Sequence, residues 1–203
     1  MGLTVIHVGK CGGLTLISLL EKHKIPHSHV HIKKPVFNSA DKYIILLRNP
    51  IDRFISAFNW RYKLVVFDKS QENRFPGEKK ILAKYTTVNS LAENIADFDI
   101  QKTYIHHIRE NIDFYLSDFL TKCQKENILG VVTQENLNND IHSIFNIRND
   151  SIHINKNTKI ADKYLSDTGY DSLKKYLQKD YECIDTLFAM GCLSAEQYYV
   201  LSR

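Results

Sequence analysis

The sequence predicts an α/β fold in three layers, with helices on both faces of a central, mostly parallel sheet. Strand-like and helical segments alternate along the chain, and this alternation is typical of a parallel sheet. The segment 43–47 is apolar at every position, as expected for a central strand that is covered on both faces. Another short apolar segment, 3–8, runs into glycines and then into a helical pattern. In such sheets, ligands bind at the carboxyl ends of the strands.

Length, composition and charge exclude several classes of protein. The chain has 203 residues, of which 43% are hydrophobic and 25% are charged, so wholesale disorder and collagen-like repeats are excluded. We expect a single domain over residues 1–203, large enough to bury a core without metal or disulfide support. The net charge of +4 is too small for a dedicated nucleic-acid coat protein. It favours an anionic ligand if the positive charge is concentrated at one place.

The cysteines and the apolar runs bear on the setting of the protein. Four cysteines lie far apart, without a C-x-x-C pair: Cys11, Cys123, Cys183 and Cys192. This spacing argues against a zinc site and a disulfide framework, and a reducing compartment is the simpler interpretation. No apolar run approaches the roughly 18 residues that span a bilayer, and the segment 3–8 leaves no room for a signal peptide. We therefore expect a cytoplasmic protein with no membrane partner.

The individual elements follow from apolar spacing and from proline and glycine. Segment 3–8 is rich in β-branched residues and predicts a buried strand. Residues 14–23 have the apolar spacing of a helix, whereas Pro26 and Pro35 make the segment 24–40 irregular. The other expected elements are helices at 50–58, 88–97, 101–124, 136–146, 170–189 and 194–202, a third strand at 128–133, and polar loops at 67–80 and 148–160.

A glycine loop joins the first strand to its helix, with the sequence Gly9-Lys10-Cys11-Gly12-Gly13-Leu14-Thr15. A strand, a glycine loop and a helix together present backbone N–H groups to a phosphate, and the helix dipole adds partial positive charge. The glycines allow close backbone approach, Lys10 supplies a point charge and Thr15 supplies a hydroxyl. This order of elements indicates a P-loop-like domain. A tight turn with an incidental lysine is the alternative interpretation.

The loop differs from that of P-loop nucleoside triphosphatases. Their motif places the lysine directly before Ser or Thr, whereas Lys10 precedes the glycines. Their central strand usually ends in an aspartate that holds Mg²⁺, whereas the strand 43–47 ends in Arg48. An arginine at this place favours direct binding of an anion. We therefore expect no metal at this site.

Two segments together resemble the carbohydrate-type sulfotransferases, the heparan-type and Golgi-like group that uses 3′-phosphoadenosine 5′-phosphosulfate (PAPS). Residues 5–15 resemble the family's 5′-phosphosulfate loop, roughly I-H-I-P-K-T-G-G-T-S/T. Residues 46–58 resemble its 3′-phosphate motif, roughly R-D-P-x-x-R-x-x-S, and Ser56 follows Arg48 by the eight residues that this pattern requires. Weaker resemblances to the family's third-strand segment and to its late Asn-containing loop lie at 131–137 and 155–157.

The resemblance implies a sulfotransferase that moves a sulfuryl group from PAPS, its co-substrate, to a hydroxyl of a saccharide or other small-molecule acceptor. Lys10 would contact the 5′-phosphosulfate and stabilise the leaving phosphate, because preorganised charge is the largest expected catalytic effect. Arg48 and Ser56 would hold the 3′-phosphate. The same resemblance assigns donor binding to the loop residues Lys10, Cys11, Gly12, Gly13, Leu14 and Thr15.

Several residues depart from the family pattern. Gly9 replaces proline, Cys11 replaces threonine, Leu14 replaces a residue that is often Ser or Thr, and Asn49 replaces aspartate. The loop therefore loses up to two hydroxyl donors, while Lys10 and the glycines are retained. A thiol at a helix N-terminus beside Lys10 would also have a lowered pKa.

The acceptor hydroxyl must lose a proton, so a general base is needed within its reach. Related glycan sulfotransferases carry a catalytic histidine between the glycine loop and the arginine strand, where this chain has His27, His29 and His31. If this segment is extended, the three histidines share one face. We expect His31 or His29 to be the base. A solvated polar loop and a three-histidine metal site are the alternatives.

The remaining histidines of interest are expected to have structural or peripheral places. His7 is expected to be packed and hydrogen-bonded rather than a base, and His106 and His107 are expected at the surface or in an acceptor cleft.

A P-loop-like small-molecule kinase is one alternative function, which a requirement for Mg²⁺ would favour. A non-catalytic binder of anionic nucleotides or nucleic acid is the other. No arginine-rich tract or nucleic-acid motif is present, so nucleic acid is not the expected partner.

Overall fold

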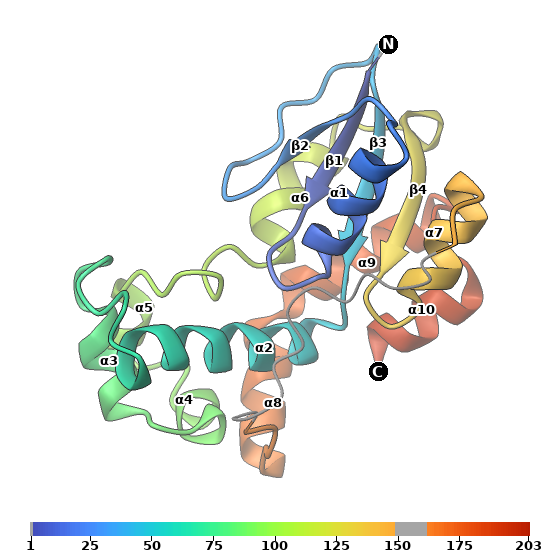
Figure 1. The fold of residues 1–203 in the computed structure, drawn as a ribbon. Coiled ribbons are helices and arrows are strands. Elements are labelled where there is room, and N and C mark those ends of the chain that lie inside the picture. Colours follow the sequence, from blue (N-terminus) through green and yellow to red (C-terminus); the bar gives the residue numbers. More distant parts are fainter. Residues whose placement is uncertain (1, 149–161) are drawn as a thin grey trace. The chain divides into compact units, whose positions relative to one another are not determined.

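The computed structural model of the protein describes residues 2–148 and 162–203. Within these ranges, four strands form one all-parallel sheet in the order β2-β1-β3-β4 (Figure 1). The strands are β1 (Leu3–His7), β2 (Ser28–Val30), β3 (Lys42–Leu47) and β4 (Ile128–Thr133). Helices flank this sheet, so the predicted three-layer α/β fold is confirmed. The polar loop expected at 148–160, apart from residue 148, lies outside the described residues, and so does the segment 155–157 within it.

The described residues divide into two compact units. One, the sheet unit, consists of residues 2–49, 110–148 and 179–203. The other, the helical unit, consists of residues 50–109 and 162–178. The expectation of a single domain over residues 1–203 stays a prediction.

The register of the sheet places the carboxyl ends of its strands side by side. His7 of β1 lies opposite Leu46 of β3, and Leu47 of β3 lies opposite Thr133 of β4. On the other side of β1, Ile6 lies opposite Val30 of β2. Because all strands run parallel, the segments that follow them emerge at the same edge of the sheet.

Helices cover both faces of the sheet, with α1 (Gly13–Lys22) on one face and α6 (Ile112–Leu120) on the other (Figure 1). Buried leucines of α1 and buried residues of α6 join the central strands in one hydrophobic core. Each fully buried aliphatic or aromatic side chain contributes about 1.5–3 kcal/mol to folding. The other helices of the sheet unit are α7 (Leu137–Phe145), α9 (Gln178–Ala189) and α10 (Ala195–Ser202).

The helical unit begins with α2 (Pro50–Tyr62), which continues into a π-helical turn at Lys63–Phe67. Its other helices are α3 (Glu78–Lys84), α4 (Val88–Glu93), α5 (Phe98–Lys102) and α8 (Asp167–Tyr176). The helix expected from Pro50 is therefore confirmed. The polar loop expected at 67–80 is wrong in its last three residues, because α3 begins at Glu78, and the sequence pattern did not predict this helix of seven residues.

The expected helix at 101–124 is wrong in its first half. Helix α5 ends at Lys102, and the next helix, α6, begins only at Ile112. The Arg109 guanidinium accounts for this ending, because it donates to the backbone carbonyls of Ile100 at 2.6 Å and of Thr103 at 3.2 Å. The carbonyl of Ile100 in α5 and that of Thr103, directly after it, thus accept hydrogen bonds from a side chain where a longer helix would supply backbone N–H groups.

Two other expectations of secondary structure are corrected. The segment 24–40 contains strand β2, which pairs with β1 through backbone hydrogen bonds and has no apolar pattern of its own. The helix expected at 170–189 is two helices, α8 and α9, with Leu177 between them. In the part of the chain that is described, no helix is both long and apolar enough to cross a membrane.

Candidate active site

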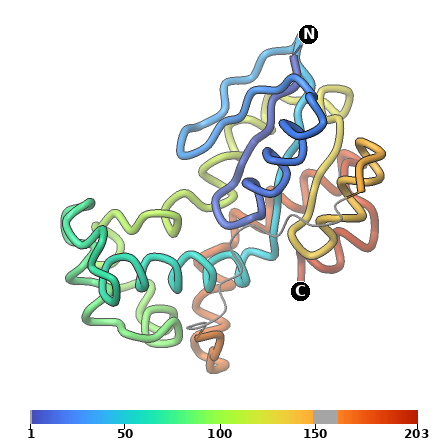
Figure 2. The backbone as a smooth tube through the Cα atoms, in the orientation of Figure 1, coloured from blue at the N-terminus to red at the C-terminus, as the bar shows by residue number. Residues whose placement is uncertain are grey.

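The glycine loop joins the end of β1 to the start of α1 (Figure 2). Lys10 lies in this loop, between His7 and Gly13. Lys10 has a φ of 72°, in the left-handed region that non-glycine residues seldom adopt. Gly12 has a φ of 80° and is the N-cap residue of α1. A lysine persists in this conformation only where the surrounding structure requires it, and such strain gathers at ligand sites.

The start of α1 offers unused hydrogen-bond donors. The Gly12 carbonyl accepts the N–H groups of Thr15 at 3.1 Å and of Leu16 at 3.4 Å. The N–H groups of Gly13 and Leu14 donate to no described residue, as is usual in the first turn of a helix. The first turn of α1 also contains no acidic side chain, so its partial positive charge suits an anion.

Gly12 and Gly13 of the loop both lie close to neighbouring side chains. A Cβ at Gly12 would lie 2.2 Å from Oε1 of Gln134, and a Cβ at Gly13 would lie 2.0 Å from Cδ2 of His7. Gly13 therefore leaves room for the His7 ring, whereas Gly12 is favoured by its positive φ, because the Gln134 side chain is flexible and can move away.

Lys10 and Arg48 bring two positive charges to the same edge of the sheet. Lys10 is half-buried. Its pKa is lowered from 10.5 to about 8, mainly by burial and to a smaller extent by repulsion from Arg48. Arg48 follows β3 directly and is also half-buried. Its guanidinium makes no hydrogen bond or ion pair with any residue in the ranges 2–148 and 162–203. An anion bound here would offset the repulsion between the two cations.

His31 lies beside His7 because β2 pairs with β1. The two rings stack with their centroids 4.1 Å apart and their planes 19° apart. Nδ1 of His31 lies 2.9 Å from the backbone carbonyl oxygen of His7. A carbonyl oxygen only accepts, so Nδ1 carries the hydrogen and Nε2 of the neutral ring holds the lone pair. Burial lowers the pKa of His31 below 6.5, so the ring is neutral at pH 7.

The structure distinguishes between the histidines that the sequence offered. His29 lies within β2 and is exposed, near enough to His7 and His31 to lower the pKa of both. Nδ1 of His27 lies 2.9 Å from the carbonyl oxygen of Ile25. His31 is half-buried and held by both a hydrogen bond and a ring contact, so the geometry favours it over His29 as a general base.

The side chains of the loop contribute unequally. The Cys11 thiol is fully buried, with Sγ 3.7 Å from the carbonyl oxygen of Gly9, so it is shielded from a ligand. Leu14 is half exposed at the first turn of α1. Thr15, which carries the hydroxyl of the loop, is buried. Cys11 and Leu14 therefore offer a ligand their backbone rather than their side chains, and the lowered thiol pKa expected for Cys11 stays a prediction.

Residues outside the predicted set secure this edge of the sheet unit. The Asn49 N–H donates to Oε1 of Glu135 at 2.9 Å, and its side-chain amide donates to the carbonyl of Arg203 at 2.8 Å. The Ile32 N–H donates to the Tyr115 hydroxyl at 3.0 Å, which anchors the chain directly after His31. The local sequence contains no signal for these contacts, because each joins residues at least 80 positions apart.

Ser56 lies on α2 in the helical unit and is half-buried. The sheet unit thus brings together Lys10, the glycines, Arg48 and His31, whereas the role of Ser56 at the 3′-phosphate stays a prediction.

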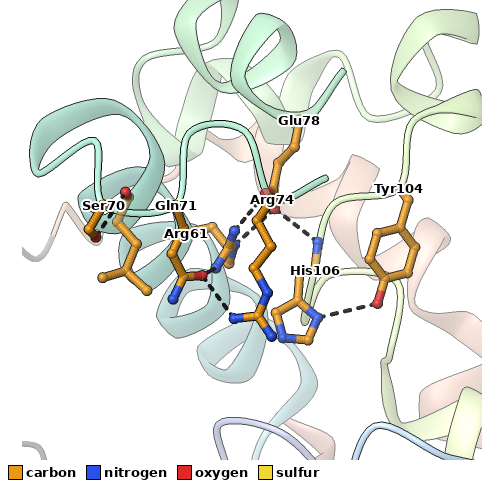
Figure 3. A network of polar contacts seen from close by, with 8 residues as sticks. Arg61, Ser70, Gln71, Arg74, Glu78, Tyr104 and His106 are labelled. Atoms are coloured by element: carbon orange, nitrogen blue, oxygen red, sulfur yellow. Dashed lines mark hydrogen bonds and ion pairs between the residues drawn. The ribbon is translucent and has the colours of Figure 1, made fainter. Parts of the chain in front are cut away.

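The surface placement expected for His106 and His107 is wrong, because both residues are buried. His106 belongs to a polar network of the helical unit (Figure 3). Its N–H donates to Oε1 of Glu78 at 3.0 Å, and its Nδ1 lies 3.2 Å from the Tyr104 hydroxyl. Glu78 also accepts two hydrogen bonds from Arg61, at 2.9 and 2.6 Å, with both side chains buried. Arg61 is therefore part of the packing of this unit.

Comparisons with protein-family models, with curated proteins and with solved structures found no match to this chain.

Proposed function

We propose that the protein is a PAPS-dependent sulfotransferase that transfers a sulfuryl group to a hydroxyl of a saccharide or other small-molecule acceptor. The observation that carries this proposal is the proximity of Lys10 and Arg48, together with the N–H groups of Gly13 and Leu14, which donate to no described residue. PAPS has two separate anionic ends, a 5′-phosphosulfate and a 3′-phosphate. A loop of N–H donors with a lysine suits the first, and a guanidinium suits the second.

The residues of the candidate site would bind the two anionic ends of PAPS separately. The Gly13 and Leu14 N–H groups and the Lys10 ammonium bind the 5′-phosphosulfate. Arg48 holds the 3′-phosphate directly, without a metal between them. Ser56 would add a hydroxyl to the same phosphate, as the sequence motif implies.

The chemistry is an in-line transfer with His31 as the base. Nε2 of His31 accepts the proton of the acceptor hydroxyl as its oxygen attacks the sulfur atom. A new O–S bond forms while the bond from sulfur to the bridging oxygen of the 5′-phosphate breaks. The electron pair of the broken bond goes to that phosphate, and Lys10 stabilises the charge that develops on it. The products are the sulfated acceptor and 3′-phosphoadenosine 5′-phosphate, and the proton is left on His31.

The setting and partners belong to the same proposal. Three of the four cysteines are buried and all four are free thiols, which suits the cytoplasm. The expected partner is the acceptor alone, without a nucleic acid, a membrane or a metal.

Calorimetric titration with 3′-phosphoadenosine 5′-phosphate in excess EDTA tests the donor site, with Mg-ATP as the comparison ligand. Dissociation constants in the micromolar range or below without metal, and much weaker binding of Mg-ATP, are the expected results. Arg48→Ala should weaken this binding, and Arg74→Ala, which removes an exposed arginine of the helical unit, should not. Preference for Mg-ATP would replace the proposal with a kinase. Tight binding without sulfation of any acceptor would leave a non-catalytic nucleotide binder.

A further inference from the structure

The ring of His7 contacts two parts of the candidate site. One is the glycine loop, because the three atoms nearest to a Cβ built on Gly13 are Cδ2, Nε2 and Cγ of His7, at 2.0–2.4 Å. The other is the ring of His31, stacked on it with the centroids 4.1 Å apart. The His7 ring thus connects the loop that carries Lys10 with the histidine that follows β2.

The His7 ring makes these contacts as a flat, uncharged group. The ring nitrogens of His7 make no hydrogen bond with any described residue. The hydrogen bond between His7 and His31 involves the backbone carbonyl of His7 and not its ring. Burial lowers its pKa from 6.5 to about 3, with smaller contributions from the charges that face it, His31, His29 and Lys10. The ring is therefore neutral at every pH at which activity would be measured.

The His31 ring needs a packing partner, such as the His7 ring, to keep one orientation. Strand β2 lies before His31 and the hydrogen bond from the Ile32 N–H to the Tyr115 hydroxyl lies after it, so these contacts hold the backbone beside His31 rather than its ring. A neutral histidine ring whose orientation is not fixed relative to a hydrogen-bond acceptor populates both tautomers, with the proton on Nδ1 in one and on Nε2 in the other. Stacking against a fixed ring keeps Nδ1 of His31 on the His7 carbonyl and leaves Nε2 as the basic atom.

We propose that His7 is a positioning residue, whose ring holds the general base His31 in one orientation and one tautomer by stacking. This inference rests on the proposed function, in which His31 is the base. It makes the shape of the His7 ring essential and its nitrogen atoms dispensable. A neutral aromatic residue should replace His7, and a small residue should not.

The first test reads the His31 ring by nitrogen-15 NMR in His7→Ala and His7→Phe. In the unchanged protein and in His7→Phe, we expect protonated Nδ1 and a His31 pKa below 6.5. In His7→Ala, a mixture of tautomers and a pKa nearer 6.5 are expected. His23→Ala, at an exposed histidine just after α1, is the matched control and should change neither quantity. Equal His31 signals in His7→Ala and the unchanged protein would overturn the proposal.

The second test compares turnover in the same variants. His7→Ala should lower kcat by roughly tenfold to a hundredfold, with a smaller effect on the KM for PAPS, because misplacing a catalytic group affects the reacting geometry. His7→Phe should retain kcat within about threefold, since loss of two nitrogens leaves the stack in place. Equal losses in both variants would show that the nitrogens matter and would also overturn the proposal.

The two failures are separable. If the unchanged protein sulfates no acceptor, the proposed function fails, while the NMR measurement still decides whether His7 orients His31. Thermal unfolding of each variant confirms that it is folded, and His7→Phe keeps the test valid if His7→Ala is not.

Discussion

The Lys10 ammonium and the Arg48 guanidinium come from adjacent parallel strands and repel one another at the edge of the sheet. Burial and this repulsion together lower the pKa of Lys10 to about 8. Two cations at one half-buried edge of the sheet destabilise the unliganded protein slightly, and a ligand that brings an anionic group to each of them removes that cost. The relationship predicts both how the site binds its ligand and how binding depends on pH.

Lys10→Ala should lower turnover by roughly a hundredfold to a thousandfold, as expected on removing a donor that stabilises developing charge. Binding of 3′-phosphoadenosine 5′-phosphate should weaken much less, because the contact strengthens in the transition state. Steady-state kinetics and calorimetry measure the two effects. Lys22→Ala, at an exposed lysine of α1, is the control. Near-normal turnover in Lys10→Ala would remove Lys10 from the chemistry.

Arg48→Ala should abolish the preference for a nucleotide with a 3′-phosphate over the same nucleotide without it. A hydrogen bond to a charged group contributes about 1.5–3 kcal/mol, which corresponds to roughly tenfold to a hundredfold in affinity. Stability should not fall, because Arg48 makes no ion pair with the described residues. Competition binding with the two nucleotides measures the preference. An unchanged preference would place the 3′-phosphate elsewhere.

The pH dependence of kcat/KM should be bell-shaped. Activity should fall below the lowered pKa of His31, where the base becomes protonated, and above about pH 8, where Lys10 of the unliganded protein loses its charge. The alkaline limb of kcat should lie at higher pH than that of kcat/KM, because the bound anion stabilises protonated Lys10. His31→Ala should lower kcat by about 10²–10⁴-fold and remove the acid limb. A profile that is flat from pH 7 to about 9 would contradict the role of Lys10.

Gly13→Ala should destabilise the protein strongly, because the new Cβ would lie 2.0 Å from the His7 ring. The same substitution should cost much less in a His7→Ala background, where all three of the nearest atoms are gone. Denaturant unfolding of the four proteins of this cycle measures the coupling, expected at about 0.5–3 kcal/mol. Additive effects of the two substitutions would contradict the contact between Gly13 and His7.

The Arg61–Glu78 pair should be the main polar support of the helical unit. Glu78→Leu leaves a buried guanidinium without its carboxylate and should cost about 3–5 kcal/mol, whereas Arg61→Met with Glu78→Leu should cost much less than this. The exposed pair Lys79–Glu72, also at 2.6 Å, is the matched control, and Glu72→Ala should change stability little. Chemical denaturation followed by circular dichroism measures the unfolding of all three variants and of the unchanged protein. Similar losses for Glu78→Leu and Glu72→Ala would contradict this assignment.

Much of the sheet unit follows from local sequence. The strands β1, β3 and β4 and the helix α1 were predictable because each is a short apolar segment with its own periodicity, and the glycine loop is a continuous motif. The same signals failed for 101–124, where the Arg109 side chain satisfies carbonyls that a helical pattern would have used.

The sequence by itself determined the residue types of the candidate site: a lysine in a glycine loop, an arginine at the end of an apolar strand, and a set of histidines between them. Tertiary structure alone decided which of them meet. Parallel pairing of β1 with β3 brings Arg48 to Lys10, and pairing of β1 with β2 places His31 rather than His29 on the His7 ring. These pairings depend on hydrogen bonds and burial between segments far apart in the chain, and local periodicity carries no information about such contacts.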